Sequence, residues 1–372
     1  MMKSVCIIRS NPVKPDSRVE KEAWSLIKAG YRVHILAWDR NSSEYESNEY
    51  INVAEIQIPI TRLGHKASFG DGFKNIIPYL AFQFHVRKWL VNHRFDIVHA
   101  CDFDTAFCSQ GIIKRQKGKF VFDVFDFLHG EPRNLFQRMV KKAQMKIIND
   151  ADATIICTEE RKRQIAGSNP KKLTIIHNTP SNIHIQNTNF NLKATNRIKI
   201  VYVGILQDYR LLKEIGEVIS ESPSLELHIG GFGKYEDLFT KLSSSFENIH
   251  FYGCLSYEQT LNLEKQCDIM LAIYDPSIEN HRFAAPNKFY ESLMLGKPIV
   301  MVKNTGMSQV VENYGIGTLI DYSKEGFRNG INRLLSKRNE WNMMSEKMQS
   351  LYHERYSWDE MNKRLLNLYN SL

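Results

Sequence analysis

Long apolar runs and clustered cysteines are both missing from this sequence of 372 residues. The apolar run near the start, Val5–Ile8, has four residues, whereas a signal-peptide core needs about 7–15 and a membrane span about 18. The six cysteines form no C-x-x-C pair, so neither a disulfide framework nor a zinc site is indicated. We therefore expect a cytoplasmic protein without a leader or membrane span.

Extremes of composition are absent as well. With 43% hydrophobic and 24% charged residues, the sequence is typical of a globular protein, which excludes a disordered chain, a collagen and a coiled coil. At roughly 150 residues per domain, the length predicts about two domains.

Charge is divided unevenly along the chain. The formal net charge of +8 is the balance of +12 in residues 1–200 and −4 in residues 201–372. A basic first half suits an anionic partner, either nucleic acid or an anionic membrane surface, and the plainer alternative is a solvated surface without a partner.

Short apolar runs alternate with amphipathic stretches, a pattern that predicts β-α-β units and parallel sheets. Strands are expected at Ser4–Ile8, Arg32–Ala37, Ile51–Ile58, Ile97–Ala100, Phe120–Phe122, Ala153–Cys157 and Leu173–His177, and then at Ile198–Val203, Leu225–Ile229, Ile249–Tyr252, Ile269–Ile273, Ile299–Val302 and Gly317–Ile320. Arg18–Lys28 is the expected first crossover helix, because its apolar residues are spaced for one face and Gly30 follows as a stop.

The predicted organisation is two doubly wound α/β domains in tandem. The first covers 1–185, a polar and asparagine-rich linker covers 186–196, and the second covers 197–355. A helix over about 356–372 is expected to return to the first domain. Ligands of open parallel sheets bind beyond the carboxyl ends of the strands, so we expect a site in a cleft between the domains.

The most informative segment is 279–300, ENHRFAAPNKFYESLMLGKPIV. Pro286 followed by Asn287 and Lys288 predicts a helix N-terminus, whose unpaired N–H groups suit a phosphate, and Lys288 adds a full charge there. Glu291 lies one turn further on, where a carboxylate accepts hydrogen bonds from two vicinal sugar hydroxyls. The plainer alternative is a capped surface helix.

The stretch PNKFYESLMLGKPIV resembles the donor-site helix of glycosyltransferase family 4, whose members have the GT-B fold of two facing Rossmann-like domains. Further fragments agree with the family in order and spacing, among them FDIVHACDFDTA, ADATIICTEE, LTIIHNTP, IKIVYVGILQDYR, ELHIGGFGK and CDIMLAIY. The resemblance covers almost the whole chain. It implies transfer of a sugar from a nucleotide-sugar with retention of configuration and without a metal.

The resemblance also implies roles for individual residues. Glu291 falls on the carboxylate that holds the donor ribose, and the helix start falls beside the diphosphate. The cation that offsets the leaving diphosphate matches Arg210. The predicted donor-binding residues are Gly204, Arg210, Lys213, Gly231, Gly253, Leu255, Pro286, Asn287, Lys288 and Glu291.

The sequence departs from the family at several positions. Phe283 stands where the family has the first glutamate of its Glu-x7-Glu motif, and Ile205 stands where it has an arginine. Cys101-Asp102 and Phe125-Asp126 replace a His-Asp and a His-Glu pair. No glycine-glycine turn follows the first strand, and the loop before Arg18 takes its place.

The chemical demand is stabilisation of a departing nucleoside diphosphate, which cations and helix-end N–H groups supply. The predicted catalytic residues are Asp104, Asp126, Arg210 and Lys288, and the predicted acceptor-side residues are Arg18, Asp102, Asp104 and Asp126. For the aspartates the alternative is a capping or solvent-facing role. His99 and His177 read as structural histidines, so neither a metal nor a cofactor other than the nucleotide-sugar donor is predicted.

Two basic stretches with large apolar neighbours, Phe73–Arg94 and Arg133–Lys146, suit helices that rest on an anionic bilayer. Packing of the same apolar stripe on the domain itself is the alternative.

The predicted function is transfer of a sugar to a lipid-linked or growing polysaccharide acceptor in bacterial surface glycan synthesis, by a cytoplasmic enzyme peripheral to the inner face of the membrane. The alternatives are a GT-B nucleotide-sugar epimerase, a basic nucleic-acid-binding protein and a donor-binding protein without activity. Nucleic acid is the weakest of these, because it leaves the Pro286–Glu291 segment unexplained. The nucleotide, the sugar, the acceptor and the oligomeric state stay open.

Overall fold

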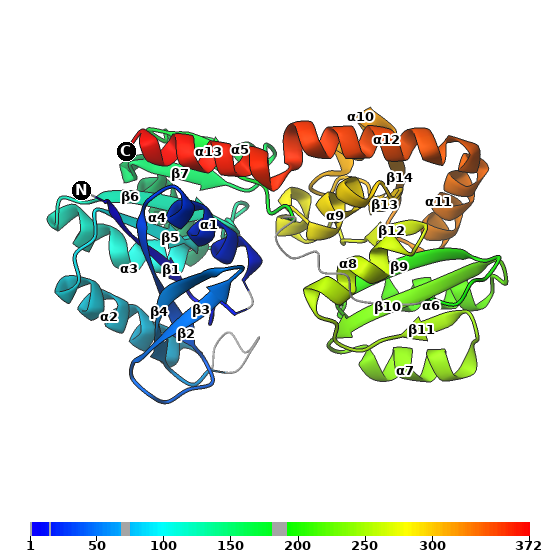
Figure 1. Ribbon diagram of the computed structural model, residues 1–372, viewed down its shortest axis with the longest axis horizontal. Helices are drawn as coiled ribbons and strands as arrows, with labels where there is room; N and C mark the ends of the chain where they lie inside the picture. The colour runs from blue at the N-terminus through cyan, green and yellow to red at the C-terminus, as the bar shows by residue number, and fades with distance from the viewer. Residues whose placement is uncertain (1, 15, 68–74, 181–191) are drawn as a thin grey trace. The chain divides into compact units, whose positions relative to one another are not determined.

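The computed structural model describes residues 2–14, 16–67, 75–180 and 192–372, which form two compact units (Figure 1). The first unit comprises Met1–His177 and Met361–Leu372, and the second comprises Asn178–Glu360. Most of the predicted linker, 186–191, and the start of the first predicted basic stretch, 73–74, lie outside the described residues.

The first unit is built on an eight-stranded sheet in the order β3-β4-β2-β1-β5-β6-β7-β8. Its strands are β1 (Ser4–Arg9), β2 (Arg32–Asp39), β3 (Ser47–Val53), β4 (Ile56–Gly64), β5 (Ile97–Cys101), β6 (Lys119–Val124), β7 (Ala153–Ile156) and β8 (Leu173–Ile175). All neighbours are parallel except β3 and β4. The predicted parallel α/β architecture is confirmed for this unit.

One predicted strand is wrong, because the stretch Ile51–Ile58 is the turn of an antiparallel hairpin rather than a single strand. Val53 pairs with Ile56, and Ala54 between them has φ of 51°. A left-handed alanine carries no sequence signal of the kind that glycine or asparagine gives in a hairpin turn. The alternating apolar residues on both sides of the turn therefore read as one strand.

The helices of the first unit connect its parallel strands. They are α1 (Ser17–Lys28), α2 (Ile76–Asn92), α3 (Asp102–Arg115), α4 (Leu135–Asp150) and α5 (Arg161–Gln164). Asp16 caps α1 by accepting from the Val19 N–H, and Asn134 caps α4 by accepting from the Gln137 N–H. These caps satisfy N–H groups that the first helical turn leaves unpaired.

The last helix, α13 (Trp358–Asn370), ends in the first unit, where it contacts β8. The buried Tyr369 hydroxyl is 2.8 Å from Nδ1 of His99, and Arg364 donates to the Ile175 carbonyl. Residues far apart in the sequence thus share one core.

A buried ion network joins α1 to the centre of this sheet. Arg18 is 2% exposed and donates three hydrogen bonds of 2.8, 2.9 and 3.1 Å to the Asp123 carboxylate, while a fourth goes to the Ile176 carbonyl. Glu22, also buried, lies 3.2 Å from the same guanidinium. Burial raises the pKa of Glu22 to about 7 although Arg18 opposes the shift.

The second unit holds a six-stranded, entirely parallel sheet in the order β11-β10-β9-β12-β13-β14. Its strands are β9 (Ile198–Ile205), β10 (Leu225–Phe232), β11 (Ile249–Phe251), β12 (Ile269–Ala272), β13 (Ile299–Val302) and β14 (Gly317–Ile320). Its helices are α6 (Leu212–Ser220), α7 (Glu236–Ser245), α8 (Tyr257–Lys265), α9 (Asn287–Leu295), α10 (Ser308–Tyr314), α11 (Lys324–Ser336) and α12 (Trp341–Leu351).

Two apolar cores sandwich this second sheet. Ile200, Leu227 and Leu271 on one face pack with α6, α7 and α11, whereas Val201 and Met270 on the other face pack with α8 and α9. Alternate residues of each strand face opposite cores, and this is why the strands read as continuous apolar runs. The predicted second α/β domain is confirmed.

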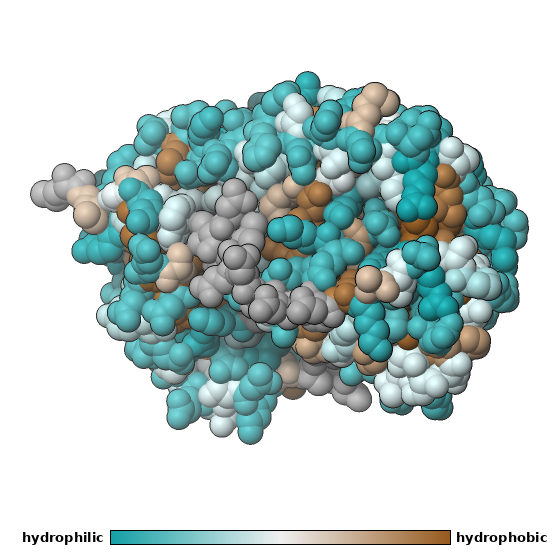
Figure 2. Space-filling model, turned by 45° about the vertical axis from the view of Figure 1, so that its right-hand side comes forward, coloured by the Kyte–Doolittle hydropathy of each residue, from teal (hydrophilic) through white to brown (hydrophobic). Residues whose placement is uncertain are grey.

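The surface shown in Figure 2 is mostly hydrophilic, with apolar side chains in separate patches. Among the described residues, every helix is too short or too polar to cross a bilayer.

The network around Arg18 yields a stability prediction. Replacing Arg18 with Met leaves the Asp123 and Glu22 carboxylates buried without their cation, so we expect the free energy of unfolding to fall by about 3–5 kcal/mol. Urea denaturation followed by circular dichroism measures this change.

The matched control is Arg163→Met, because Arg163 is 75% exposed and forms only an i,i+3 pair with Glu160. Its loss is expected to cost less than about 1 kcal/mol. Equal urea midpoints for the two variants would show that the buried network stabilises the fold no more than the exposed pair does.

Candidate functional site

Three glycines meet at the carboxyl ends of neighbouring strands in the second unit. A Cβ on Gly231 would lie 1.8 Å from the carbonyl oxygen of Gly204, and Gly231 also has φ of +136°. Its N–H donates to the Gly253 carbonyl at 2.7 Å. A side chain at Gly231 would clash with this carbonyl. The ends of β9 and β10 are therefore bare backbone, which a ligand can approach closely.

The start of α9 faces the same strand ends. Pro286 is its N-cap, and the N–H groups of Asn287 and Lys288 belong to the first turn, where an α-helix has no internal partner for them. A Cβ on Gly204 would lie 3.0 Å from Nζ of Lys288. The ammonium therefore sits directly beside the backbone at the end of β9.

The Lys288 ammonium is partly buried beside the ring of Tyr202. Nζ lies 5.1 Å from the ring centroid of Tyr202. Burial opposes its charge, but Tyr202, Tyr274, Glu291 and Glu264 together outweigh this effect and raise the pKa of Lys288. The ammonium group is therefore positively charged at neutral pH, in a site where it is only partly exposed to solvent.

A second cation, Arg210, lies at the same strand ends. Its guanidinium carbon is 4.0 Å from the ring centroid of Tyr274, and Nη1 is 3.1 Å from Nε2 of His281. A side-chain hydrogen bond also links Arg210 to Tyr202. Lys288 and Arg210 thus both contact Tyr202, one at its ring and the other through a side-chain hydrogen bond, and together they form a positive site suited to a diphosphate.

Glu291 lies one turn into α9 and is 3% exposed. The hydroxyl of Tyr257, at the start of α8, hydrogen-bonds to it. Its carboxylate is thereby held in place rather than free to rotate. A fixed, largely dehydrated carboxylate is the group that recognises paired hydroxyls.

A further carboxyl, Glu264, is fully buried beside Glu291 and Lys288, and neither of its oxygens has a hydrogen-bond partner. Burial, followed by the charge of Glu291, raises its pKa well above the ordinary value. Burial therefore shifts this carboxyl toward its protonated form. The sequence analysis missed this residue because α8 carries no recognisable motif at that position.

The remaining predicted donor residues are spread around this centre. Leu255 packs over Gly230, since a Cβ there would lie 2.8 Å from Cδ1 of Leu255. Asn287 accepts a 2.8 Å hydrogen bond from Asn178. Lys213 is exposed, and its ammonium nitrogen lies 5.0 Å from the ring centroid of Tyr235.

In the first unit, three predicted acidic residues follow the carboxyl ends of β5 and β6. Asp102 accepts from the N–H groups of Phe125 and Asp126 at 3.0 and 2.9 Å, and it pairs with Arg9. Burial, reinforced by Asp126 and Asp104, raises its pKa to about 6 although Arg9 opposes this.

Asp104 and Asp126 differ in their surroundings. Burial raises the pKa of Asp104, which hydrogen-bonds to Ser10. Asp126 is 62% exposed and lies 3.0 Å from the buried Arg161 guanidinium. Asp126 is thus accessible to a ligand, while Arg18 is 2% exposed and engaged with Asp123. Their catalytic and acceptor roles stay predictions.

The sequence analysis missed the cation of this edge, Arg9, at the end of β1. Its guanidinium carbon lies 4.2 Å from the ring centroid of Phe125 and also contacts Asp16 and Asp102. A lone arginine after a strand offered no signal by itself.

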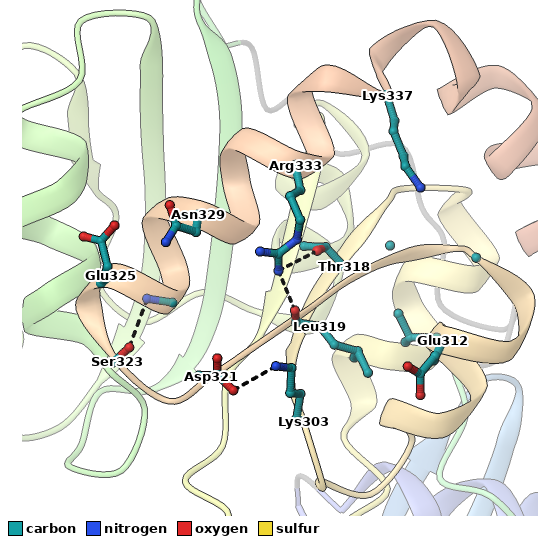
Figure 3. Close-up of a pocket in the computed structure, with 14 residues that line it drawn as sticks. Lys303, Glu312, Thr318, Leu319, Asp321, Ser323, Glu325, Asn329, Arg333 and Lys337 are labelled. Atoms are coloured by element: carbon teal, nitrogen blue, oxygen red, sulfur yellow. Dashed lines mark hydrogen bonds and ion pairs between the residues drawn. The ribbon is translucent and has the colours of Figure 1, made fainter.

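A cavity of about 570 Å³ lies along the edge strand β14, between α10 and α11 (Figure 3). Two of its cations are already engaged, since Arg333 donates to the Leu319 carbonyl at 2.8 Å and Lys303 pairs with Asp321 at 2.9 Å. No predicted donor residue lines it. The better candidate site is therefore the one at the carboxyl ends of β9 and β10, around Gly204, Gly231 and Gly253, which we call the glycine edge.

The two singled-out histidines are buried. His99 lies 3.4 Å from Asp123, and its other nitrogen bonds to Tyr369. The tertiary structure brings Cys101 within ligand distance of both, but Asp123 is already saturated by Arg18, so this cluster is an ion network rather than a metal site. His177 is 3.4 Å from Glu159.

Comparison with known proteins places the chain in a family. Residues 18–179 match the family Glycosyltransferase Family 4, and residues 185–351 match Glycosyl transferases group 1. No protein of curated function matches the sequence significantly.

Solved structures resemble the whole chain. Sucrose-phosphate synthase from Thermosynechococcus elongatus has 12% identity and a TM-score of 0.76, with 99% of this chain and 98% of that one covered. HepE from Anabaena, solved with UDP, has 13% identity and a TM-score of 0.68 with 100% of both chains covered. UDP-GlcNAc 2-epimerase from Methanocaldococcus jannaschii has 14% identity and a TM-score of 0.64, with 99% of this chain and 100% of that one covered.

At these identities the likeness shows the fold, which is GT-B. The two family matches, which together span most of the sequence, show more: the chain belongs to the glycosyltransferases, with a family 4 domain followed by a group 1 glycosyl transferase domain.

Proposed function

We propose that this glycosyltransferase transfers a sugar from a nucleoside-diphosphate-sugar to a lipid-linked or growing polysaccharide acceptor in bacterial surface glycan synthesis. The observation that carries the donor half is the cationic pair at the glycine edge. Lys288 lies over the ring of Tyr202, Arg210 hydrogen-bonds to the same tyrosine, and Lys288 belongs to the first turn of α9. UDP in HepE and ADP in starch synthase IV, proteins of similar structure, support a nucleoside diphosphate.

The donor diphosphate lies at the start of α9 in this proposal. Negative charge grows on it as the bond to the anomeric carbon breaks, so a fixed cation and N–H groups stabilise the transition state more than the ground state. Gly204 and Gly231 let the diphosphate approach the backbone, because neither residue carries a side chain that would stand between them. Glu291 accepts hydrogen bonds from the ribose hydroxyls, and Tyr257 keeps its carboxylate oriented.

The reaction retains anomeric configuration and needs no metal in this proposal. The acceptor hydroxyl attacks the face that the leaving phosphate vacates, and a phosphate oxygen takes the hydroxyl proton. The protein's part is to hold both groups, with Lys288 and Arg210 compensating charge that a divalent ion would otherwise balance. In the first unit, the exposed Asp126 orients the acceptor hydroxyl.

The membrane part of the proposal rests on the exposed apolar side chains of α2 and α4. On α4, Leu135, Phe136 and Met139 are 77%, 68% and 68% exposed. On α2, Ile77 and Phe84 are 80% and 62% exposed. These side chains are separate from those that α2 and α4 bury in the core, so packing within the unit does not account for them.

Basic side chains accompany this apolar surface of α2 and α4. Those exposed on the two helices are Arg87, Lys88, Arg138, Lys142 and Lys146. Each cation near an anionic bilayer contributes roughly 1 kcal/mol, while apolar side chains enter the boundary between headgroups and acyl chains. This combination suits a peripheral protein at the inner face of the cytoplasmic membrane.

The rival within the fold is a nucleotide-sugar epimerase, since UDP-GlcNAc 2-epimerase has a similar structure. An epimerase acts on the donor alone. Incubating the chain with nucleotide-sugar and no acceptor, then examining the sugar by NMR, separates the two, because appearance of an epimer would favour the rival.

Donor recognition gives the first test. Titration calorimetry with UDP, ADP and GDP is expected to show a clear preference for one nucleotide. Glu291→Ala is expected to weaken that binding about 10–100-fold, because a hydrogen bond to a charged group is worth about 1.5–3 kcal/mol.

Glu312→Ala is the control for this test, since Glu312 is an exposed carboxylate on α10 of the same unit. It should bind the nucleotide as the parent does. Unchanged affinity in a folded Glu291→Ala protein would contradict the assigned ribose contact.

Catalysis gives the second test. Lys288→Met is expected to lower kcat about 10²–10³-fold, the usual cost of losing one group that stabilises a developing anion. Release of nucleoside diphosphate from the preferred nucleotide-sugar, with a bacterial membrane-lipid extract as acceptor, measures this rate. Lys337→Met removes an exposed lysine of the same unit and should leave the rate unchanged. If Lys288→Met released nucleoside diphosphate as fast as Lys337→Met, Lys288 would have no role in catalysis.

Membrane contact gives the third test. The protein is expected to sediment with vesicles of phosphatidylcholine and phosphatidylglycerol at low salt, and less so at high salt. The double variant Phe136→Ser/Met139→Ser is expected to stay mostly in the supernatant.

Met343→Ser is the matched control, because Met343 is a 64% exposed methionine in the second unit. It should sediment like the parent. Recovery of the parent protein wholly in the supernatant would end the membrane proposal and leave the donor assignment intact.

A further inference from the structure

Three potential metal ligands converge on one face of the second sheet, away from the glycine edge. Glu226 and His228 are two residues apart on β10 and so point to the same side. His250 on β11 is the register partner of His228. His228 lies three residues before Gly231, which places this cluster about 10 Å from the glycine edge at the rise of a β-strand.

The ligand atoms of this Glu-His-His cluster approach one another closely. Oε1 of Glu226 is 3.1 Å from Nε2 of His228 and 2.9 Å from Nε2 of His250. All three atoms lie within 4.8 Å of one another. Ligands at 2.0–2.2 Å from a tetrahedral zinc ion are about 3.3 Å apart, so small side-chain adjustments suffice to admit one.

Two imidazole nitrogens converge on one carboxylate oxygen. Nε2 of the buried His228 and Nε2 of His250 lie 3.1 and 2.9 Å from the same Oε1 of Glu226, so the three atoms face a common centre. A cation at that centre would be bound by all three groups at once.

Outer contacts hold two of the ligands in the orientation that a metal needs. Nδ1 of His228 is 2.8 Å from the Tyr252 hydroxyl, which leaves Nε2 as the coordinating nitrogen. The other carboxylate oxygen of Glu226 accepts a 2.7 Å hydrogen bond from Thr195. Metal-bound histidines and carboxylates commonly have such second partners.

Access and charge are compatible with an ion. The His250 side chain is 38% exposed, so water reaches the cluster and an open coordination position faces solvent. Lys199, on the adjacent strand β9, directs its ammonium to the Lys193 carbonyl at 3.1 Å instead of to the carboxylate.

We propose that Glu226, His228 and His250 form a binding site for one divalent transition-metal ion, with zinc as the best match to two imidazoles and a carboxylate. The fourth ligand is water. Bound there, the ion ties the segment around Thr195 to β10 and β11, so the site stabilises the second unit and takes no part in sugar transfer. This departs from the prediction that the chain binds no metal.

The test uses the full chain, freed of metal by a chelator and then titrated with CoCl2. Cobalt(II) in a tetrahedral nitrogen and oxygen site gives visible absorption bands, which ZnCl2 should then abolish by displacement. One ion per chain is expected, together with a higher thermal unfolding midpoint in ZnCl2. His250→Ala is expected to remove the bands, and because His250 is partly exposed this variant should fold.

Two further variants separate coordination from structure. Tyr252→Phe removes only an outer partner and is expected to lower zinc affinity about 10–100-fold. His353→Ala and Cys254→Ser change exposed ligand-type residues elsewhere and should bind as the parent does. The proposal is overturned by absence of the bands in the parent, by bands that persist in His250→Ala, or by their loss in either control.

Discussion

A partly dehydrated ammonium group at the start of α9 is the interaction on which the candidate site depends. Lys288 keeps its charge there because Tyr202, Tyr274, Glu291 and Glu264 offset the cost of burial. A cation in such surroundings acts on a developing negative charge more strongly than one in bulk water, since less solvent screens it. The same ammonium lies against Gly204, so the end of β9 and the start of α9 form one surface.

That surface reconciles two facts about charge that conflict at first sight. Residues 201–372 carry a net charge of −4, yet the proposed ligand is an anion. Lys288 and Arg210 make the site locally positive through Tyr202, whereas surface acids such as Glu217 and Glu221 pair with Lys324 elsewhere. The net charge of a domain affects how fast a ligand approaches it, whereas a few charged groups at the site determine how tightly the ligand binds.

Sequence reasoning was strongest where a pattern is local. The alternation of apolar runs and amphipathic helices predicts both parallel sheets, and Pro286 with Asn287 predicts the start of α9 to the residue. It failed at the β3–β4 hairpin, because Ala54 adopts a left-handed conformation there and alanine is not a residue that predicts one. It also missed Glu264, because no motif on α8 marks that position and only the fold brings it beside Glu291.

The sequence by itself determined the fold class, the helix that carries Lys288 and Glu291, and the division of charge between the halves, since each depends on residues near one another in the chain. Only the tertiary structure decided which side chains meet. It joined Lys288 to Tyr202, Arg210 to His281, and Glu226 to His250, and it committed Arg18 to a buried network with Asp123. The physical reason is that parallel strands place neighbours side by side from segments dozens of residues apart, and no local spacing records those pairings.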